Sequence, residues 1–319
     1  MDTRPQEPSQ QAARHILFLG LLSVFVLVFH RALWTVIGAS LTVDKYSHIL
    51  LVAPVSALLL YQNRKRVFAE VSYAKSAAML LVLAGCVFAF SLTRAAGFSV
   101  NDWVSWSFFL FVCSGLSAFL LCYGSKAFRA GLFPLLFLVL LVPLPDAILQ
   151  RCIAGLQNGS AAVACDLFRL AHVPFVRHGV VLQLPRIDIY VAEECSGIRS
   201  SLVLILSSLV LGHLYLKSFW GKALLVLAVV PMTIAKNGLR IFVLSTLGIY
   251  VNPSFLSGRL HHQGGFIFFG LAFAGLVVLI WFFQKLEVLR RNVPTRTSPL
   301  PSPPKIGKEL HVGSILGKG

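Results

Sequence analysis

The sequence has few charged residues and very few acidic ones. Charged residues make up 13% of the 319 residues and hydrophobic residues 57%, whereas about a quarter of the residues in a soluble globular domain are charged. The 12 Asp and Glu residues stand against 28 Lys and Arg residues, which gives a net charge of +16. This scarcity of charge excludes an ordinary soluble domain and predicts an integral membrane protein.

The excess of basic residues does not predict a nucleic-acid-binding protein. The Lys and Arg residues are scattered between apolar segments and in a proline-rich tail, whereas a nucleic-acid interface gathers them along one face. The cytoplasmic loops of membrane proteins carry such residues. We therefore expect the chain to contact membrane lipid and no nucleic acid.

The sequence also lacks a cysteine framework. Its six cysteines include no CxxC pair, which argues against a zinc site and a dense disulfide scaffold, and we expect no metal or other cofactor. Cys152 and Cys165 lie thirteen residues apart on an expected helix, so we predict that both stay reduced and packed. Residues 1–14 are polar, and the apolar stretch after them has no signal-peptide cleavage site, which predicts a retained span.

Long apolar runs are the main feature that the sequence does have. About 20 apolar residues in a helix cross the hydrocarbon of a bilayer, and we identify about eight such segments. They lie near residues 15–35, 48–62, 76–93, 103–123, 129–149, 196–216, 220–245 and 264–284. The predicted fold is all-α, a polytopic transmembrane bundle over residues 15–291 that follows a short cytoplasmic tail at 1–14.

The short loops predict the orientation of this bundle. Four groups of basic residues fall on one side under the eight-span count, namely Arg64-Lys65-Arg66, Lys126 with Arg129, Lys217 with Lys222, and Arg290-Arg291. Cytoplasmic loops are enriched in Lys and Arg, so this side and both termini are expected in the cytoplasm, for a multi-pass protein of the inner (plasma) membrane. Residues 292–319, with five prolines among Ser, Thr and Lys, are expected to form a disordered cytoplasmic tail.

A long insertion at about 147–194 falls on the opposite, extracytoplasmic side. Its first part has apolar residues at helical spacing, and its second part alternates, with β-branched residues in 180–184 and 187–191. We predict an amphipathic helix on the outer surface, followed by a small β-hairpin that turns at Pro185-Arg186.

Cys195 follows this insertion, at the start of the sixth span, and is the candidate nucleophile. At a helix N-terminus, backbone N–H groups and the helix dipole favour a thiolate, and Arg199 adds a positive charge about one turn on. The alternative is a small hydrophobe that packs among apolar neighbours. The polar residues Glu193-Glu194 and Ser196-Gly197 on either side of Cys195 argue against that alternative.

Arg240 lies inside the seventh span, in the run Lys236-Asn237-Gly238-Leu239-Arg240. An ionisable residue in a span is costly and is therefore a candidate for function, although an Arg near a helix end can also anchor the helix at the interface. At about 1.5 Å per residue, Arg240 is about 30 Å from Trp220, and Cys195 is about 33 Å from Lys217. Both residues are therefore expected at the outer boundary of the hydrocarbon.

His261 and His262 open the eighth span at the same outer level. A lone histidine there is more often an interfacial hydrogen-bonding residue than a catalyst. Together with Cys195 and Arg240, however, a histidine completes a combination suited to acyl transfer. The imidazole takes the thiol proton, and the cation holds a substrate carboxylate or the oxyanion.

Three segments of the chain resemble the signatures of the exosortase and archaeosortase family, in the same order and at similar spacing. They are Cys195-Ser196-Gly197-Ile198-Arg199-Ser200, Asn237-Gly238-Leu239-Arg240-Ile241, and His261 with Gly265. Tyr46-Ser47-His48 also resembles the family's YSHG motif, with Ile49 in place of Gly, and Val142-Pro143-Leu144-Pro145 followed by Leu156-Gln157 is a further match. The resemblance covers about residues 30–285.

The resemblance implies a membrane cysteine transpeptidase or protease, a hydrolase that forms a thioester on Cys195. Its partners would be exported proteins with a C-terminal sorting signal of the PEP-CTERM type, which has a short motif, an apolar helix and a basic end. Arg240 would be the family's arginine. The family's histidine commonly stands four residues before a Gly, which favours His261 over His262. Supporting roles would fall to Arg199, Asn237, Ser196 and Gly197.

Two other functions remain open on the sequence alone. A non-catalytic transporter or assembly subunit for exopolysaccharide export would also have many spans and few charges, although its polar groups are usually near the bilayer midplane. A membrane acyltransferase would pass the acyl group from the Cys thioester to a lipid. The sequence does not indicate the substrate, the acceptor that releases the thioester, or the oligomeric state.

Overall fold

The protein is a multi-pass helical membrane protein, as its composition predicts. The computed structural model describes residues 8–43, 46–74, 76, 79, 80, 83, 85–87, 90, 97–185, 187–191, 198–252 and 265–292. Five of the described helices are long and apolar enough to cross a membrane. They are α1 (Pro8–Val28), α6 (Val100–Ala130), α9 (Ile198–Tyr215), α10 (Phe219–Tyr250) and α12 (Gly265–Asn292). Helix α1 begins inside the segment predicted as a polar tail.

The other three predicted spans differ from a single straight helix or lie outside the described residues. The second is the 14-residue helix α3 (Ile49–Gln62), and residues 76–93 are mostly outside the described part of the chain. The fifth consists of α7 (Leu132–Phe137) and the 3-10 helix η3 (Leu138–Leu141), which meet α8 (Asp146–Leu170) at an angle of 89°. Counting that bent pair as one span gives six. Pro143 and Pro145 explain the bend, because proline interrupts helical hydrogen bonding.

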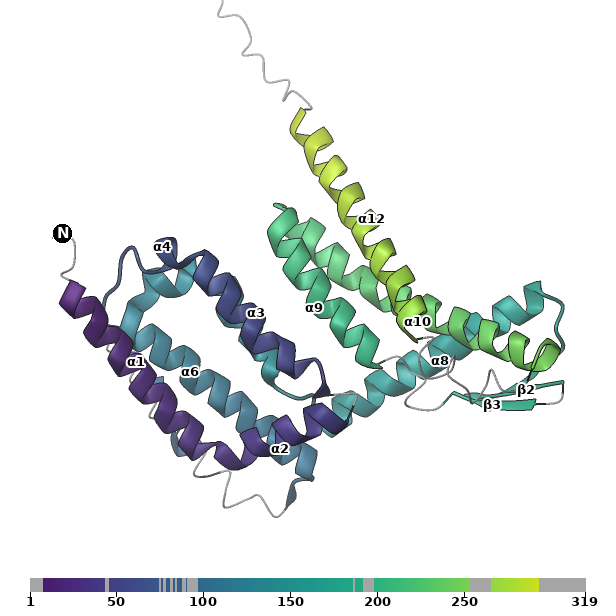
Figure 1. Ribbon diagram of the computed structural model, residues 1–319, viewed down its shortest axis with the longest axis horizontal. Helices are drawn as coiled ribbons and strands as arrows, with labels where there is room; N and C mark the ends of the chain where they lie inside the picture. The colour runs from purple at the N-terminus through teal and green to yellow at the C-terminus, as the bar shows by residue number, and fades with distance from the viewer. Residues whose placement is uncertain are drawn as a thin grey trace, which may run out of the picture.

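The N-terminal helices form one group on one side of the molecule (Figure 1). Helices α1 and α2 (His30–Thr42) pack on α6, and α3 packs on α7 and η3, while the short helix α4 (Arg64–Val67) follows α3. Helix α6 is interrupted at Gly124, where φ is +82°. A Cβ there would lie 2.6 Å from the backbone oxygen of Ser72, so only glycine fits without a shift of the chain.

A buried cation lies beside this interruption. Arg14 Nη1 donates to the carbonyl oxygen of Cys122 at 2.9 Å, and its guanidinium lies 3.9 Å above the centre of the Tyr73 ring. Because the carbonyl groups at a helix C-terminus carry partial negative charge, Arg14 stabilises the end of the first part of α6. Its charge therefore has a structural partner.

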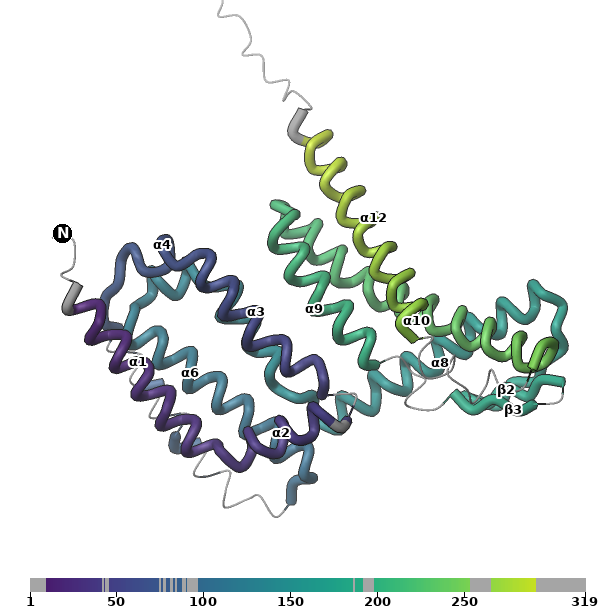
Figure 2. The backbone as a smooth tube through the Cα atoms, viewed as in Figure 1, coloured from purple at the N-terminus to yellow at the C-terminus, as the bar shows by residue number. Residues whose placement is uncertain are grey.

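The C-terminal helices α9, α10 and α12 form a second group. They share a core that includes Leu204, Leu225, Val229 and Leu276, and Figure 2 shows their paths beside one another. At the α9–α10 connection, Glu287 of α12 accepts hydrogen bonds from the backbone N–H groups of Lys217 (3.1 Å) and Ser218 (2.8 Å). The three helices are thereby tied together at this end.

Helix α8 runs from the N-terminal group along α10 to a three-stranded antiparallel sheet (Figure 1). The strands are β1 (Val176–His178), β2 (Val181–Leu184) and β3 (Ile187–Tyr190), in that order. The predicted helix and hairpin are both present, although Arg186 lies outside the described residues. The sequence analysis did not predict β1. The sheet packs against α8 and α10 through a buried cluster that includes Phe168, Leu182 and Ile241.

Cys152 is exposed and Cys165 is buried, and neither forms a disulfide. Both thiols are free, as predicted, but only Cys165 is packed; the prediction that Cys152 is packed is wrong, because its side chain lies on an exposed face of α8. Residues 1–7 and 293–319 lie outside the described part of the chain, so the predicted disorder of the proline-rich tail stays a prediction.

Candidate active site

The candidate site is built on α10, and its contact with α8 fixes Asn237. The Asn237 side chain is 1% exposed, and its Nδ2 donates to Ser160 Oγ of α8 at 3.1 Å. The next residue, Gly238, allows the two helices to approach closely, because a Cβ there would lie 2.6 Å from Cβ of Val163. Asn237 therefore orients α10 against α8.

The first turn of α9 is tied to the same part of α10. Lys236 is 8% exposed, and its Nζ donates a hydrogen bond to Ser200 Oγ. Ser200 is five residues after Cys195 and the third residue of α9. The contact therefore fixes the start of α9 beside α10.

Arg240 and Arg199 belong to the same region. Arg240 is half-buried and follows Lys236 by one helical turn, so the two cations share one face of α10. Arg199 is exposed in the first turn of α9. We call Arg199, Lys236 and Arg240 the cationic cluster. The structure thus gathers three predicted site residues, Arg199, Asn237 and Arg240, at one end of the α9–α10 pair.

The predicted nucleophile lies just outside the described residues. Residues 192–197, which include Cys195, Ser196 and Gly197, are not described. Both flanks of this segment are held in place. Before it, the carbonyl oxygen of buried Val191 accepts a hydrogen bond from Gln157 Nε2 of α8 at 2.8 Å. After it, Ser200 is held by Lys236.

The predicted histidines, His261 and His262, are also outside the described residues, but α12 begins three residues later. A Cβ on Gly275 of α12 would lie 3.1 Å from Cε of Met232 of α10, which aligns these two antiparallel helices. Gly265 is ten residues, about 15 Å, from Gly275, and Arg240 is eight residues, about 12 Å, from Met232. The start of α12 is therefore close to the level of Arg240.

The sequence analysis did not select Lys236 or Ser200 as site residues. The signal was present, because Lys236 precedes Arg240 by four residues in an otherwise apolar segment. Two cations at that spacing repel each other on a helix, so their presence needs an explanation. The partner of Lys236 was not visible in the sequence, since it depends on how α9 packs on α10.

A second polar cluster joins the two other motifs that carried the resemblance, because Asn101, which contacts Tyr46, also donates through Nδ2 to the carbonyl oxygen of Leu144 at 2.9 Å. Asp146, the first residue of α8, accepts from Asn101 Nδ2 (2.8 Å) and Ser99 Oγ (2.6 Å), and its backbone N–H donates to Asp102 Oδ1 (2.8 Å). The hydroxyl of Tyr46 donates to Asn101 Oδ1. We call Tyr46, Ser99, Asn101, Asp102 and Asp146 the carboxylate network. It connects the start of α8 to the N-terminal group.

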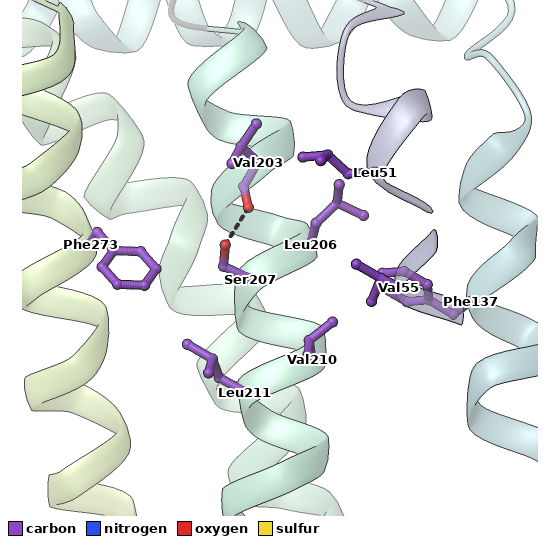
Figure 3. Close-up of a pocket in the computed structure, with 9 residues that line it drawn as sticks. All are labelled: Leu51, Val55, Phe137, Val203, Leu206, Ser207, Val210, Leu211 and Phe273. Atoms are coloured by element: carbon purple, nitrogen blue, oxygen red, sulfur yellow. Dashed lines mark hydrogen bonds between the residues drawn. The ribbon is translucent and has the colours of Figure 1, made fainter. Parts of the chain in front are cut away.

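An apolar cavity of about 240 Å³ lies between α3, α7, α9 and α12 (Figure 3). Its lining includes Leu51, Val55, Leu206 and Phe273, and its polar side chain, Ser207, donates to the carbonyl oxygen of Val203 at 2.8 Å. The lining contains no ionisable residue, so this cavity does not supply the groups for acyl transfer. Among the described residues, no group of three or more His, Cys, Asp or Glu side chains is arranged to hold a metal ion.

Comparison with known proteins gives one match. A family model described as transmembrane exosortase matches residues 34–278, which is most of the chain. This range contains both polar clusters, the sheet and the segments that precede α9 and α12. No curated protein and no solved structure matches the chain.

Proposed function

Since the chain belongs to the transmembrane exosortase family, we propose that it is a membrane cysteine transpeptidase that cleaves the C-terminal sorting signals of exported proteins. Cys195 is the nucleophile, Arg240 the electrostatic stabiliser, and His261 or His262 the acid–base group. The site faces the outer side of the inner membrane, where a substrate held by its apolar helix presents its motif.

The hydrogen bond between Lys236 and Ser200 is the observation that carries this proposal. It fixes the first turn of α9 beside the part of α10 that bears Arg240. Three residues span at most about 11 Å of chain, so covalent geometry keeps Cys195 within that distance of Ile198. The aligned start of α12 supports a role for the histidines, because His261 is four residues before Gly265.

The proposed reaction has two steps. The histidine takes the proton of the Cys195 thiol, and the thiolate attacks the scissile carbonyl carbon, with the oxyanion stabilised by Arg240. The C–N bond then breaks, the histidine returns the proton to the leaving amine, and a thioester remains on Cys195. In the second step, water or an amine attacks the thioester, loses its proton to the histidine, and restores the thiol.

The test uses the full chain in vesicles and a reporter protein that ends in a short motif, an apolar helix and a basic segment. Cys195→Ala is expected to reduce processing to background, a loss of about 10⁴-fold or more. The matched control, Cys152→Ala, removes an exposed cysteine of α8 and should process normally. A thioester adduct released by hydroxylamine should form with the parent chain and not with Cys195→Ala.

Equal processing by Cys195→Ala and the parent chain would contradict the assignment of the nucleophile. That result would favour a non-catalytic transport or assembly role. A thioester whose acyl group passes to a lipid, with no new peptide bond or free peptide end, would instead indicate an acyltransferase.

A further inference from the structure

Strand β3 has one edge that no described strand covers. The strand order is β1-β2-β3, so β3 pairs with β2 on one side only. The chain continues in register beyond β3, where the backbone N–H of Val191 donates to the carbonyl oxygen of Val180 at 3.0 Å. Hydrogen-bonded pairs alternate along an antiparallel ladder. Leu182 and Ile189 are therefore the next pair that exchanges backbone hydrogen bonds.

Asp188 and Tyr190 consequently direct their backbone N–H and C=O groups away from β2. Both residues are exposed, and Tyr190 keeps 61% of its accessible surface. In the part of the chain that the structure describes, no hydrogen bond is made to these four backbone groups. We call them the free edge of β3. A row of donors and acceptors of this kind can pair with another extended chain.

The free edge belongs to the part of the molecule that carries the candidate active site. The sheet lies at the ends of α8 and α10 (Figure 1). Leu182 of the sheet and Ile241 of α10 belong to one buried cluster, and Ile241 directly follows Arg240. Cys195 comes five residues after Tyr190, and five residues span at most about 18 Å. The free edge is therefore held near the residues that the proposed function assigns to the reacting carbonyl.

The substrate of the proposed function supplies an extended segment at this level of the membrane. Its apolar helix ends at the outer boundary of the hydrocarbon, and its motif is the stretch of chain that emerges there. The backbone groups of such a stretch need hydrogen-bonding partners, and a sheet edge supplies them by strand addition. Two residues of β3 offer such groups, which suits a short peptide. A stable interface between two folded proteins needs a much larger surface.

We propose that the free edge of β3 binds the substrate motif as an added strand, through the backbone groups of Asp188 and Tyr190. This inference rests on the proposed function and adds to it the way in which the motif is held. Hydrogen bonds between the two main chains set the position of the scissile bond relative to Cys195. Every second residue of the motif faces β3, because the direction of the backbone groups alternates along a strand.

The first experiment changes only the backbone of the substrate. Synthetic reporters carry the short motif, the apolar helix and the basic segment, with a single N-methyl group at successive positions of the motif outside the scissile bond. Each methyl group replaces one amide hydrogen and leaves every side chain unchanged. With the parent chain in vesicles, kcat/KM should fall about 10-fold or more at every second position, mainly through KM, because a hydrogen bond is lost and the methyl group meets the β3 backbone. The positions between should change less than about 3-fold.

The second experiment changes the backbone of the enzyme. Tyr190→Pro and Tyr190→Ala both remove the side chain, but only the first removes the N–H group, and an edge strand tolerates proline where that group faces outward. Tyr190→Pro should process the unmethylated reporter about 3- to 10-fold less well than Tyr190→Ala, through KM. The difference should disappear with the reporters that methylation already weakens, because changes at groups in direct contact are not additive.

The matched control for this pair is Arg177→Pro against Arg177→Ala. Arg177 lies on β1, the other edge of the sheet, and by the same alternation its N–H group points away from β2. These two variants should process every reporter equally well. Removal of an outward N–H group is then harmful on the edge near Cys195 and harmless on the opposite edge.

Three outcomes would overturn the inference while leaving the proposed function in place. In the first, N-methylation lowers the rate equally at all positions of the motif, or at none. In the second, Tyr190→Pro and Tyr190→Ala process all reporters alike. In the third, the parent chain is a dimer that Tyr190→Pro dissociates, and the methylated reporters are processed normally, so that the edge pairs two copies of this chain. The reporter scan cannot unfold the enzyme. Failure of the proposed function is separate, because Cys195→Ala would then process the unmethylated reporter.

Discussion

The carboxylate network and the cationic cluster are both polar clusters at helix ends, but they gather side chains of opposite charge. The carboxylates of Asp102 and Asp146 lie in the first turns of α6 and α8, where the positive end of the helix dipole favours them, and Asp146 accepts from the side chains of Ser99 and Asn101. In the cationic cluster, Arg199 lies at a helix N-terminus that disfavours it, and Lys236 donates to a neutral hydroxyl.

The difference indicates which cluster serves folding and which serves chemistry. A network whose donors and acceptors satisfy one another stabilises the contact between two helix groups. Adjacent cations such as Lys236 and Arg240 repel each other on a helix, which costs folding free energy, and proteins retain such a cost mainly at functional sites. The comparison therefore predicts that substitutions in the cationic cluster reduce activity, whereas those in the carboxylate network reduce stability.

The largest expected effect is that of Arg240→Gln. Loss of the cation should lower the processing rate by about 10²- to 10³-fold, the usual cost of removing one group that stabilises an oxyanion. The midpoint of unfolding by SDS in mixed micelles, followed by circular dichroism, should stay close to that of the parent chain. Arg129→Gln, which changes an exposed residue at the end of α6, is the control. A normal processing rate for Arg240→Gln would contradict the claim that the cationic cluster serves the reaction.

An intermediate effect is expected for Asp146→Ala. The substitution leaves Asn101 and Ser99 without their shared acceptor, which should lower the free energy of unfolding by about 1–3 kcal/mol. The processing rate per folded molecule should not change. Asp166→Ala, which breaks an exposed ion pair with Arg169, should have little effect on either quantity. If Asp146→Ala lowered the rate and left stability intact, the assignment of a structural role would be wrong.

The smallest expected effect is that of Tyr46→Phe. It removes one hydroxyl group from the edge of the carboxylate network, at a cost of about 1 kcal/mol. The same SDS titration measures the change, and Tyr250→Phe, at an exposed position, provides the reference. If Tyr46→Phe and Tyr250→Phe unfolded at the same SDS midpoint, the Tyr46 hydroxyl would not contribute to stability, and the network would end at Asn101.

The sequence predicted the long helices well, because apolar runs such as those of α6, α9, α10 and α12 leave few alternatives in a membrane. It also predicted α8 and the hairpin, from the change of apolar spacing near residue 171. It did not predict the break before α8, although Pro143 and Pro145 were visible, because hydropathy alone does not separate a span from two shorter helices. Of the eight predicted segments, five are spanning helices, one is the bent pair before and including α8, one is the short helix α3, and one, at 76–93, is mostly outside the described residues.

The candidate site was predictable only in part. Arg240 and Asn237 stood out because polar residues are rare in an apolar helix, and the structure places both with Arg199 at one end of α9 and α10. The roles of Lys236, Ser200 and Ser160 depend on which faces of α8, α9 and α10 meet, and no local pattern gives that information. The roles of Cys195, Ser196, Gly197, His261 and His262 remain predictions that the proposed experiments test.

The two polar clusters are joined by one continuous helix. Helix α8 takes part in the carboxylate network at Asp146 and holds α10 at Ser160, and the fourteen helical steps from one residue to the other rise by about 21 Å. Because each residue turns a helix by about 100°, one residue inserted between these points would rotate Ser160 away from Asn237 while Asp146 stayed in place. The length of α8 thus sets both the distance and the relative rotation between the N-terminal helices and α10, the helix that carries Arg240.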